Sequence, residues 1–119
     1  PDVSHCGGMT ELKKIANMAE VYYVHTAPHC SIGPVAFSSC MQVDACIPNF
    51  FIQEQVDASL GNGLLLEDWK VKSGYIDLPS KPGLGFEIDE DVACRIVDSN
   101  QPELGGDQWF HEDGSVADW

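Results

Sequence analysis

Apolar and polar positions follow a helical period at the start of the chain and then give way to a denser run. Apolar residues at positions 12, 15, 16 and 19 recur at a spacing of three or four residues, and the polar positions Lys13, Lys14, Asn17 and Glu20 fall on the other face. This spacing predicts an amphipathic helix from an N-cap at Thr10 to about Glu20. Residues 21–24 are β-branched or aromatic, which predicts a strand ending near Ala27.

A second helix and a further strand follow in the same order. Pro34 stands behind Gly33, and proline suits the first turn of a helix because its missing N–H would be unpaired there. Apolar positions continue to Val43, and Pro48 ends the pattern. Residues 49–52 are a short apolar run, typical of a strand covered on both faces. The first half of the chain therefore has a β-α-β-α-β order.

Three residues that can carry chemistry close the three predicted strands. Asp2, His29 and Glu54 lie 27 and 25 positions apart, close to the roughly 30 residues per unit of a (β/α)₈ barrel. Side chains just beyond the carboxyl ends of parallel strands face a common cleft. We therefore predict an α/β fold in which residues 1–55 are part of such a barrel. This part contains three strands, with a helix after each of the first two.

The alternation of strands and helices ends after Gln55, and residues 56–119 form a second unit in the predicted organisation. Turn-forming residues enclose two short strands or extended pieces at 75–78 and 85–88. Asp89 is a predicted N-cap for a brief helix to about Val97. Aromatic residues in the polar tail suggest that it docks on a larger body; they are Trp109, Phe110 and Trp119. His111 is predicted to be a surface residue.

The net charge and the apolar content of the chain indicate which classes of binding partner and which compartment to expect. The chain has 119 residues, enough for one domain, with 19 acidic and 6 basic residues and a formal charge of −13. Such a charge disfavours nucleic acid and anionic membranes as partners. The sequence has no apolar run long enough for a membrane span and no signal-peptide pattern, so we expect a cytoplasmic protein. It begins at Pro1 without an initiating methionine, and we expect a fragment of a longer protein.

Cysteine usage points to a reducing compartment. The five cysteines form no C-x-x-C pair, and an odd number cannot all pair within one chain. Cys40 and Cys46 fall within the apolar pattern of the second helix, so both are predicted to be buried small hydrophobic residues.

An acid, an imidazole and a second acid in one cleft can perform proton transfer. A carboxylate beside an imidazole fixes its tautomer and raises its basicity, so His29 with Asp2 is the candidate catalytic dyad. The alternative is structural: Asp2 could form the turn before Gly7-Gly8, and His29 could bond only to backbone. Glu54 follows an apolar run and needs solvent or a partner.

A metal site is a second interpretation of the same stretch. The candidate zinc ligands are His25, His29 and Cys30. His5 and Cys6 are two further candidates. However, the predicted strand ends between the two histidines, so their four-residue spacing does not place them on one helix face.

The order of several motifs resembles the C-terminal part of the enolase superfamily, the mandelate racemase and muconate lactonizing enzyme group. Within it the acid-sugar dehydratases of the galactonate dehydratase type are most similar. The matching motifs are Pro1-Asp2-Val3-Ser4-His5-Cys6-Gly7-Gly8, residues 10–16, Ala27-Pro28-His29-Cys30 with Gly33-Pro34, Gln53-Glu54-Gln55, Lys81-Pro82-Gly83-Leu84-Gly85 and residues 111–119.

The resemblance implies strands 6 to 8 of a modified (β/α)₈ barrel, ending at Asp2, His29 and Glu54, and a tail that packs on a capping domain. It implies a general base at His29, an orienting partner at Asp2, and in Glu54 a group that hydrogen bonds to the substrate carboxylate or enolate. The substrate would be a small sugar acid, dehydrated to a 2-keto-3-deoxy acid by a Mg²⁺ enzyme that is a homo-oligomer when full length. The metal ligands are expected on strands that this chain does not contain.

Two β/α units and one strand cannot close a barrel, so we expect this chain alone to bind no Mg²⁺ tightly and to lack dehydratase activity. Two rivals remain open beside the zinc protein. One is a racemase or epimerase of the same superfamily, and the other is a non-catalytic remnant that serves as a binding or assembly piece.

Overall fold

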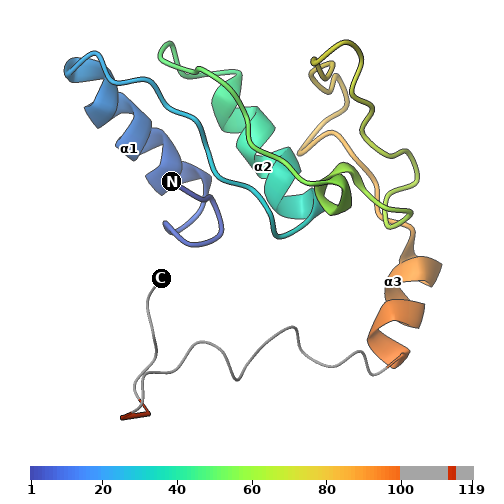
Figure 1. Ribbon diagram of the computed structural model, residues 1–119. Helices are drawn as coiled ribbons and strands as arrows, with labels where there is room; N and C mark the ends of the chain where they lie inside the picture. The colour runs from blue at the N-terminus through green and yellow to red at the C-terminus, as the bar shows by residue number, and fades with distance from the viewer. Residues whose placement is uncertain (100–112, 115–119) are drawn as a thin grey trace.

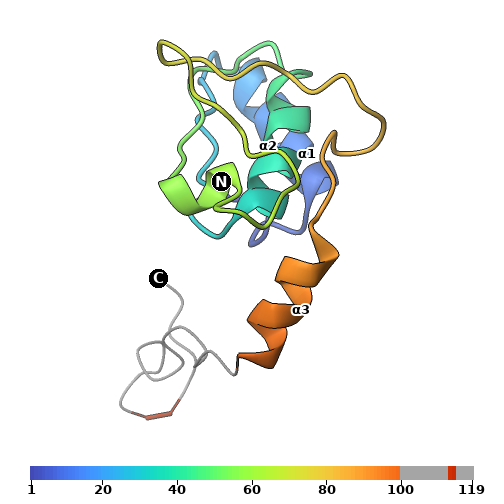
Figure 2. The ribbon, with the colours of Figure 1, turned by 90° about the vertical axis from the view of Figure 1, so that its right-hand side faces the viewer.

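The computed structural model describes residues 1–99, 113 and 114, and Figure 1 shows how they are arranged. Helices α1 (Met9–Val21) and α2 (Pro34–Asp44) lie side by side, followed by the short 3₁₀ helix η1 (Asp57–Leu60) and helix α3 (Glu90–Asp98). Figures 1 and 2 both show α3 projecting away from the pair formed by α1 and α2. The predictions for residues 100–112 and 115–119, which include His111 and the aromatic tail, concern positions outside the described residues.

Helix α1 confirms the predicted amphipathic stripe but begins earlier than Thr10. Gly8 is its N-cap and has a φ of +93°, a conformation that glycine adopts without strain. Leu12 and Ala16 are buried on the stripe.

The prediction of a strand over residues 21–24 is wrong. Val21 belongs to the last turn of α1, and Tyr23 adopts a left-handed φ of +57°. The N–H groups of Tyr22 and Val24 both donate to the Ala19 carbonyl. These bonds satisfy the carbonyl groups at the end of the helix, so they outweigh the local β-propensity of the aromatic run.

Helix α2 begins at Pro34 as predicted and supplies much of the core. Its N-cap, Gly33, makes no side-chain cap bond, and Phe37, Cys40 and Met41 are buried. Together with the stripe of α1 they form one apolar cluster, whose members are Val3, Leu12, Ala16, Cys30, Phe37, Cys40, Met41, Val43 and Ile47. Cys46, by contrast, is exposed, because it lies beyond the end of the helix; its predicted burial is wrong.

Three extended segments, residues 1–3, 24–30 and 49–54, run alongside one another next to the two helices. Parallel bridges join Asp2 to His29 and Thr26 to Phe50. Within the described residues these bridges are isolated, so the predicted strands are present only as parallel extended segments. One reason is that Pro28 has no N–H with which to continue the pairing.

Asn49 ties the second and third segments to α1. Its Nδ2 donates to the carbonyls of Ala16 and Val24, each at 2.9 Å, and lies 3.1 Å from Thr26 Oγ1. Asn49 is itself buried, so these bonds form in an environment shielded from water. The asparagine therefore fixes the start of the third segment.

Residues 56–99 confirm the predicted helix cap, and the strand pairing described among them consists of isolated bridges. Asp89 accepts a hydrogen bond from the N–H of Val92 at 3.0 Å and caps α3. Antiparallel bridges join Leu65 to Ile88 and Lys72 to Tyr75 in place of the predicted short strands. No helix among the described residues has the length and apolarity needed to cross a membrane.

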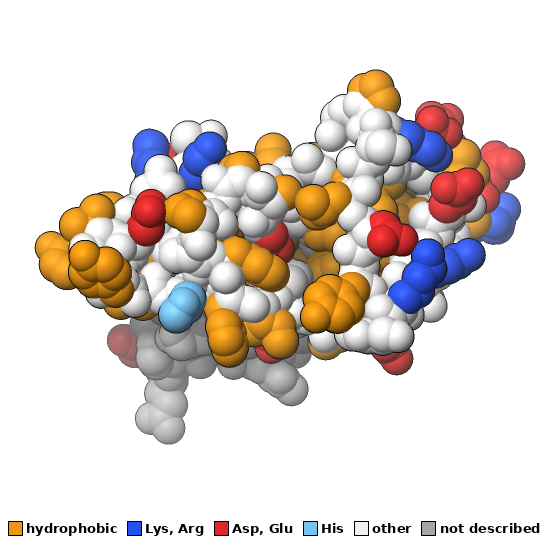
Figure 3. Space-filling model, turned by 90° about the horizontal axis from the view of Figure 1, so that it is seen from above, with side chains coloured by type: hydrophobic (Ala, Val, Ile, Leu, Met, Phe, Trp, Pro, Cys, Tyr) orange, Lys and Arg blue, Asp and Glu red, His pale blue; other side chains and the backbone are white. Residues whose placement is uncertain are grey.

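The surface carries many large apolar side chains. Figure 3 shows apolar side chains spread over the face seen from above. The large apolar side chains that are more than half exposed include Tyr22, Tyr23, Phe51 and Ile52. Their exposure leaves one side of the extended segments without an apolar cover within the described residues.

Candidate active site

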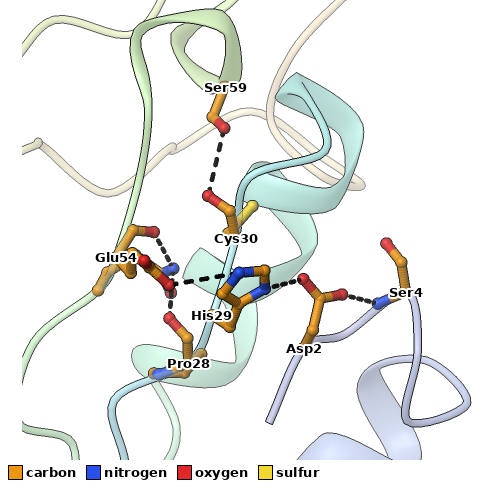
Figure 4. Close-up of polar contacts among 8 residues, drawn as sticks. Asp2, Ser4, Pro28, His29, Cys30, Glu54 and Ser59 are labelled. Carbon is orange, nitrogen blue, oxygen red and sulfur yellow. Dashed lines mark hydrogen bonds and ion pairs between the residues drawn. The ribbon is translucent and has the colours of Figure 1, made fainter. Parts of the chain in front are cut away.

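The structure brings together all three residues predicted for proton transfer. His29 Nδ1 lies 2.8 Å from Asp2 Oδ2, and His29 Nε2 lies 3.7 Å from Glu54 Oε2 (Figure 4). The parallel bridge between Asp2 and His29 explains the first contact, because bridged residues point to the same face of the pair. Each of the three residues comes from a different extended segment.

Burial differs sharply between the two carboxylates. The Asp2 side chain is 5% exposed, whereas those of His29 and Glu54 are 37% and 56% exposed. The N–H of Ser4 donates to Asp2 Oδ1 at 2.7 Å, so both carboxylate oxygens of Asp2 are bonded. Asp2 is therefore held rigidly behind the imidazole, while Glu54 stands at an open edge.

The environment of Asp2 favours its charged form. Burial raises the pKa of this carboxyl group, but the hydrogen bonds from His29 and Ser4 and the nearby His5 and His29 charges outweigh it. The net pKa lies below its ordinary value of 3.8. An ionised Asp2 accepts a hydrogen bond from a protonated Nδ1. In a neutral imidazole this leaves the lone pair on Nε2.

The dyad faces an open surface. A shallow hollow among the described residues lies between the first turns of α1 and α2, and Met9, Ile32 and Val35 contribute apolar walls to it. None of Asp2, His29 and Glu54 lines that hollow. The described residues thus provide acid–base groups without the walls of a substrate cleft.

The predicted zinc ligands do not converge. His25 is exposed, and its ring lies 5.8 Å from that of Phe51, while Cys30 is fully buried. Among residues 1–99, 113 and 114, no three His, Cys, Asp or Glu side chains are placed to hold a metal ion. These residues by themselves fit neither a zinc nor a Mg²⁺ site.

Helix α2 carries a half-buried acid that the sequence pattern does not predict. Asp44 sits one turn after Cys40 on α2, and within the described chain its Oδ1 is buried without a hydrogen-bond partner. Burial, with a smaller contribution from Cys30, raises the pKa of Asp44 to about 7. Contact with Cys30 and burial likewise raise the pKa of the Cys40 thiol. The only sequence signal for Asp44 is its spacing of four from Cys40, on the same helix face.

Comparison with known proteins gives the setting of this site. Residues 1–92 match the family model described as enolase C-terminal domain-like. The chain belongs to the enolase C-terminal domain-like family. Membership confirms the predicted resemblance to the enolase superfamily.

Relatives in this family carry enzyme names. The D-galactonate dehydratase of Variovorax paradoxus (strain S110) is 46% identical over 129 residues, which cover 100% of this chain and 33% of that protein. The D-galactonate dehydratase of Xanthomonas campestris pv. campestris (strain B100) is 44% identical over 127 residues, again covering 100% of this chain and 33% of the relative. The chain therefore spans about a third of the length of the curated relatives it matches.

Solved structures agree on the fold. The mandelate racemase/muconate lactonizing enzyme from Sulfitobacter sp. has a TM-score of 0.67 and 41% identity, and the match covers 73% of this chain and 22% of that one. The corresponding enzyme from Jannaschia sp. CCS1 has a TM-score of 0.69 and 29% identity, with coverage of 75% and 23%. The chain thus has the fold of one part of enolase-superfamily barrel enzymes.

Proposed function

We propose that this chain supplies the proton-transfer half of a hydro-lyase that acts on a small sugar acid, with His29 as base, Asp2 as its orienting partner and Glu54 beside the reacting carboxylate. The observation that carries the proposal is the placement of His29 between the two acids, at 2.8 and 3.7 Å. The names of the D-galactonate dehydratase relatives support a sugar acid as substrate.

Proton removal follows from the asymmetry of the imidazole. Asp2 accepts the hydrogen bond from Nδ1–H, so the lone pair on Nε2 is directed toward the open side where a substrate binds. Nε2 takes the proton next to the substrate carboxylate, and the electrons of the C–H bond form an enolate. The charge that develops on the ring is stabilised by Asp2, which lies 2.8 Å from Nδ1.

Elimination completes the reaction. The enolate electrons form a C2–C3 double bond as the β-hydroxyl leaves as water, with a proton from a general acid outside this chain. The resulting enol takes up a proton at C3 and loses its C2 hydroxyl proton, which gives a 2-keto-3-deoxy acid. Glu54 hydrogen bonds to the carboxylate or enolate oxygen, a role that requires a proton on Glu54. In a full-length enzyme, Mg²⁺ held by residues outside this chain would supply a positive charge near the substrate carboxylate.

A chimera tests the proposal. This chain would replace the matched third of the Variovorax paradoxus D-galactonate dehydratase, and the purified protein would be assayed with Mg²⁺ and a panel of aldonates for 2-keto-3-deoxy acid. We expect turnover, and a loss of roughly 10²- to 10⁴-fold in His29→Asn. His25→Asn is the matched control and should stay within about twofold of the parent. A folded chimera without turnover, or an active His29→Asn variant, contradicts the proposal.

The names of the solved neighbours favour racemisation as the second candidate. A racemase or epimerase would exchange the α-proton for solvent deuterium and return the acid without a keto product. Mass spectrometry of the chimera reaction in ²H₂O separates the two outcomes. The 119-residue chain alone is expected to produce neither, because its dyad lies on an open surface.

A further inference from the structure

Pairing between the second and third extended segments changes register by one residue at Pro28. Thr26 N–H donates to the Asn49 carbonyl at 2.8 Å, and Phe51 N–H donates to the Thr26 carbonyl at 2.9 Å, which pairs Thr26 with Phe50. Regular parallel pairing would next place the N–H of residue 53 on the Pro28 carbonyl. Instead the N–H of Glu54 occupies that position, at 3.2 Å. One extra residue therefore lies in the third segment, as in a β-bulge.

The side chain of Gln53 fills the place left by its own backbone N–H. Gln53 Nε2 donates to the Pro28 carbonyl at 3.0 Å and to the Glu54 carbonyl at 2.5 Å. Figure 4 draws these bonds beside His29. Both partners are carbonyl oxygens, which only accept, so the amide must present its NH₂ group to them. The amide thus joins the residue before His29 to Glu54.

The extra residue decides which side chain stands next to His29. Side chains alternate between the two faces of an extended segment, so the pairing of Thr26 with Phe50 would align residue 53 with His29. With one residue inserted, Glu54 takes that position, and its Oε2 lies 3.7 Å from His29 Nε2. Pro28 has no N–H that could donate to the third segment. The one-residue offset at this point therefore depends on hydrogen-bond donors of the third segment itself.

We infer that Gln53 is a positioning residue whose side-chain amide holds this one-residue offset and so brings the Glu54 carboxylate to the imidazole of His29. Gln53 acts through Glu54 and contacts no reacting atom. The inference rests on the proposed function for its catalytic meaning, because the place of Glu54 matters to turnover only when His29 is the base. The placement itself is a property of this chain and is measured without turnover.

The test compares Gln53→Met with Gln55→Met in the 119-residue chain. Methionine matches glutamine in length but donates no hydrogen bond. Gln55 is a matched control because the side-chain oxygens of Gln53 and Gln55 both lack a hydrogen-bond partner within the described residues. The readouts are nuclear Overhauser contacts from the His29 ring to the Glu54 γ-protons and to the Asp2 β-protons, together with hydrogen exchange of the Glu54 amide.

In Gln53→Met we expect the contacts between His29 and Glu54 to disappear and the Glu54 amide to exchange at least about tenfold faster, with the contacts between His29 and Asp2 retained. Gln55→Met should keep both sets. Gln53→Asn, whose amide is drawn back by one methylene, should show the same losses in weaker form. A folded Gln53→Met that keeps its Glu54 contacts and protection overturns the inference.

Two other outcomes have a defined meaning. If both Gln53 variants fail to fold while Gln55→Met folds, Gln53 supports the chain as a whole, and the positioning role is overturned. If the Glu54 contacts are lost as expected but the chimera described above shows no turnover, the positioning role stands and the dehydratase proposal fails. The two proposals therefore fail in separate experiments.

Discussion

Replacing Asp2 by asparagine probes the centre of the site, because the change keeps the shape of the side chain and removes its charge. Asp2 accepts one hydrogen bond from Ser4 N–H at 2.7 Å and another at His29 Nδ1 at 2.8 Å. Asparagine has a single oxygen acceptor. Ser4 N–H can only donate, so the amide oxygen stays on Ser4 and the NH₂ group turns toward His29.

That orientation moves the proton of the imidazole. Nδ1 must then accept a hydrogen bond, so the ring proton shifts to Nε2, the atom that the proposed reaction needs as a base. In the chimera we expect kcat to fall by roughly 10²- to 10⁴-fold, the range seen when a catalytic histidine is held in the wrong tautomer. The tautomer itself is read from ¹⁵N chemical shifts of the His29 ring in this chain.

The same substitution has a stability signature with a defined sign. Loss of a hydrogen bond to a charged group costs about 1.5–3 kcal/mol in the free energy of unfolding. Because the folded-state pKa of Asp2 is lowered below 3.8, its contribution is complete above pH 3.8 and is lost as the pH falls through the folded-state pKa. The difference between Asp2→Asn and the parent should therefore shrink on acidification, as measured by urea unfolding. A pH-independent difference, or a ring proton that remains on Nδ1, refutes the reasoning.

Three further predictions concern the core. Burial raises the pKa of Asp44 to about 7 from 3.8, so the parent should gain stability relative to Asp44→Asn as the pH falls from above 7 toward 3.8; an unchanged difference in urea midpoints contradicts this. Asn49→Ala should lower the free energy of unfolding by about 2–4 kcal/mol, against about 0.5 kcal/mol or less for the exposed control Asn17→Ala in thermal melts. Iodoacetamide should label exposed Cys46 in the native state, and buried Cys40 only after unfolding, as mass spectrometry can show.

Features of the fold that rest on one residue and its neighbours could be predicted from the sequence. Pro34 starts α2 because its missing N–H costs nothing there, and Asp89 caps α3 through a bond to a residue three positions ahead. The run at 21–24 shows where such reasoning fails. Its side chains favour a strand, but the carbonyl of Ala19 draws the following N–H groups into a helix end, and that competition cannot be read from side-chain type.

The candidate site divides in the same way. The even spacing of Asp2, His29 and Glu54 predicts that they meet, and the geometry brings them together. The spacing does not show that Glu54 reaches His29 through an extra residue, because the change of register depends on hydrogen bonds between segments 25 residues apart in sequence. The burial of Asp44 Oδ1 could not be predicted either, since a charged residue at the end of a helix is usually solvated.

The missing N–H of Pro28 gives the site one fixed side and one adjustable side. On the Asp2 side, His29 is held by its backbone N–H and by its ring, so the base and its proton keep one arrangement. On the Glu54 side, Pro28 accepts hydrogen bonds but donates none, so at this point the neighbouring segment is held by its own donors, the Glu54 N–H and the Gln53 amide. Sequence change in residues 49–54 can therefore alter what lies next to the exposed side of the imidazole while the contact between Asp2 and His29 stays intact.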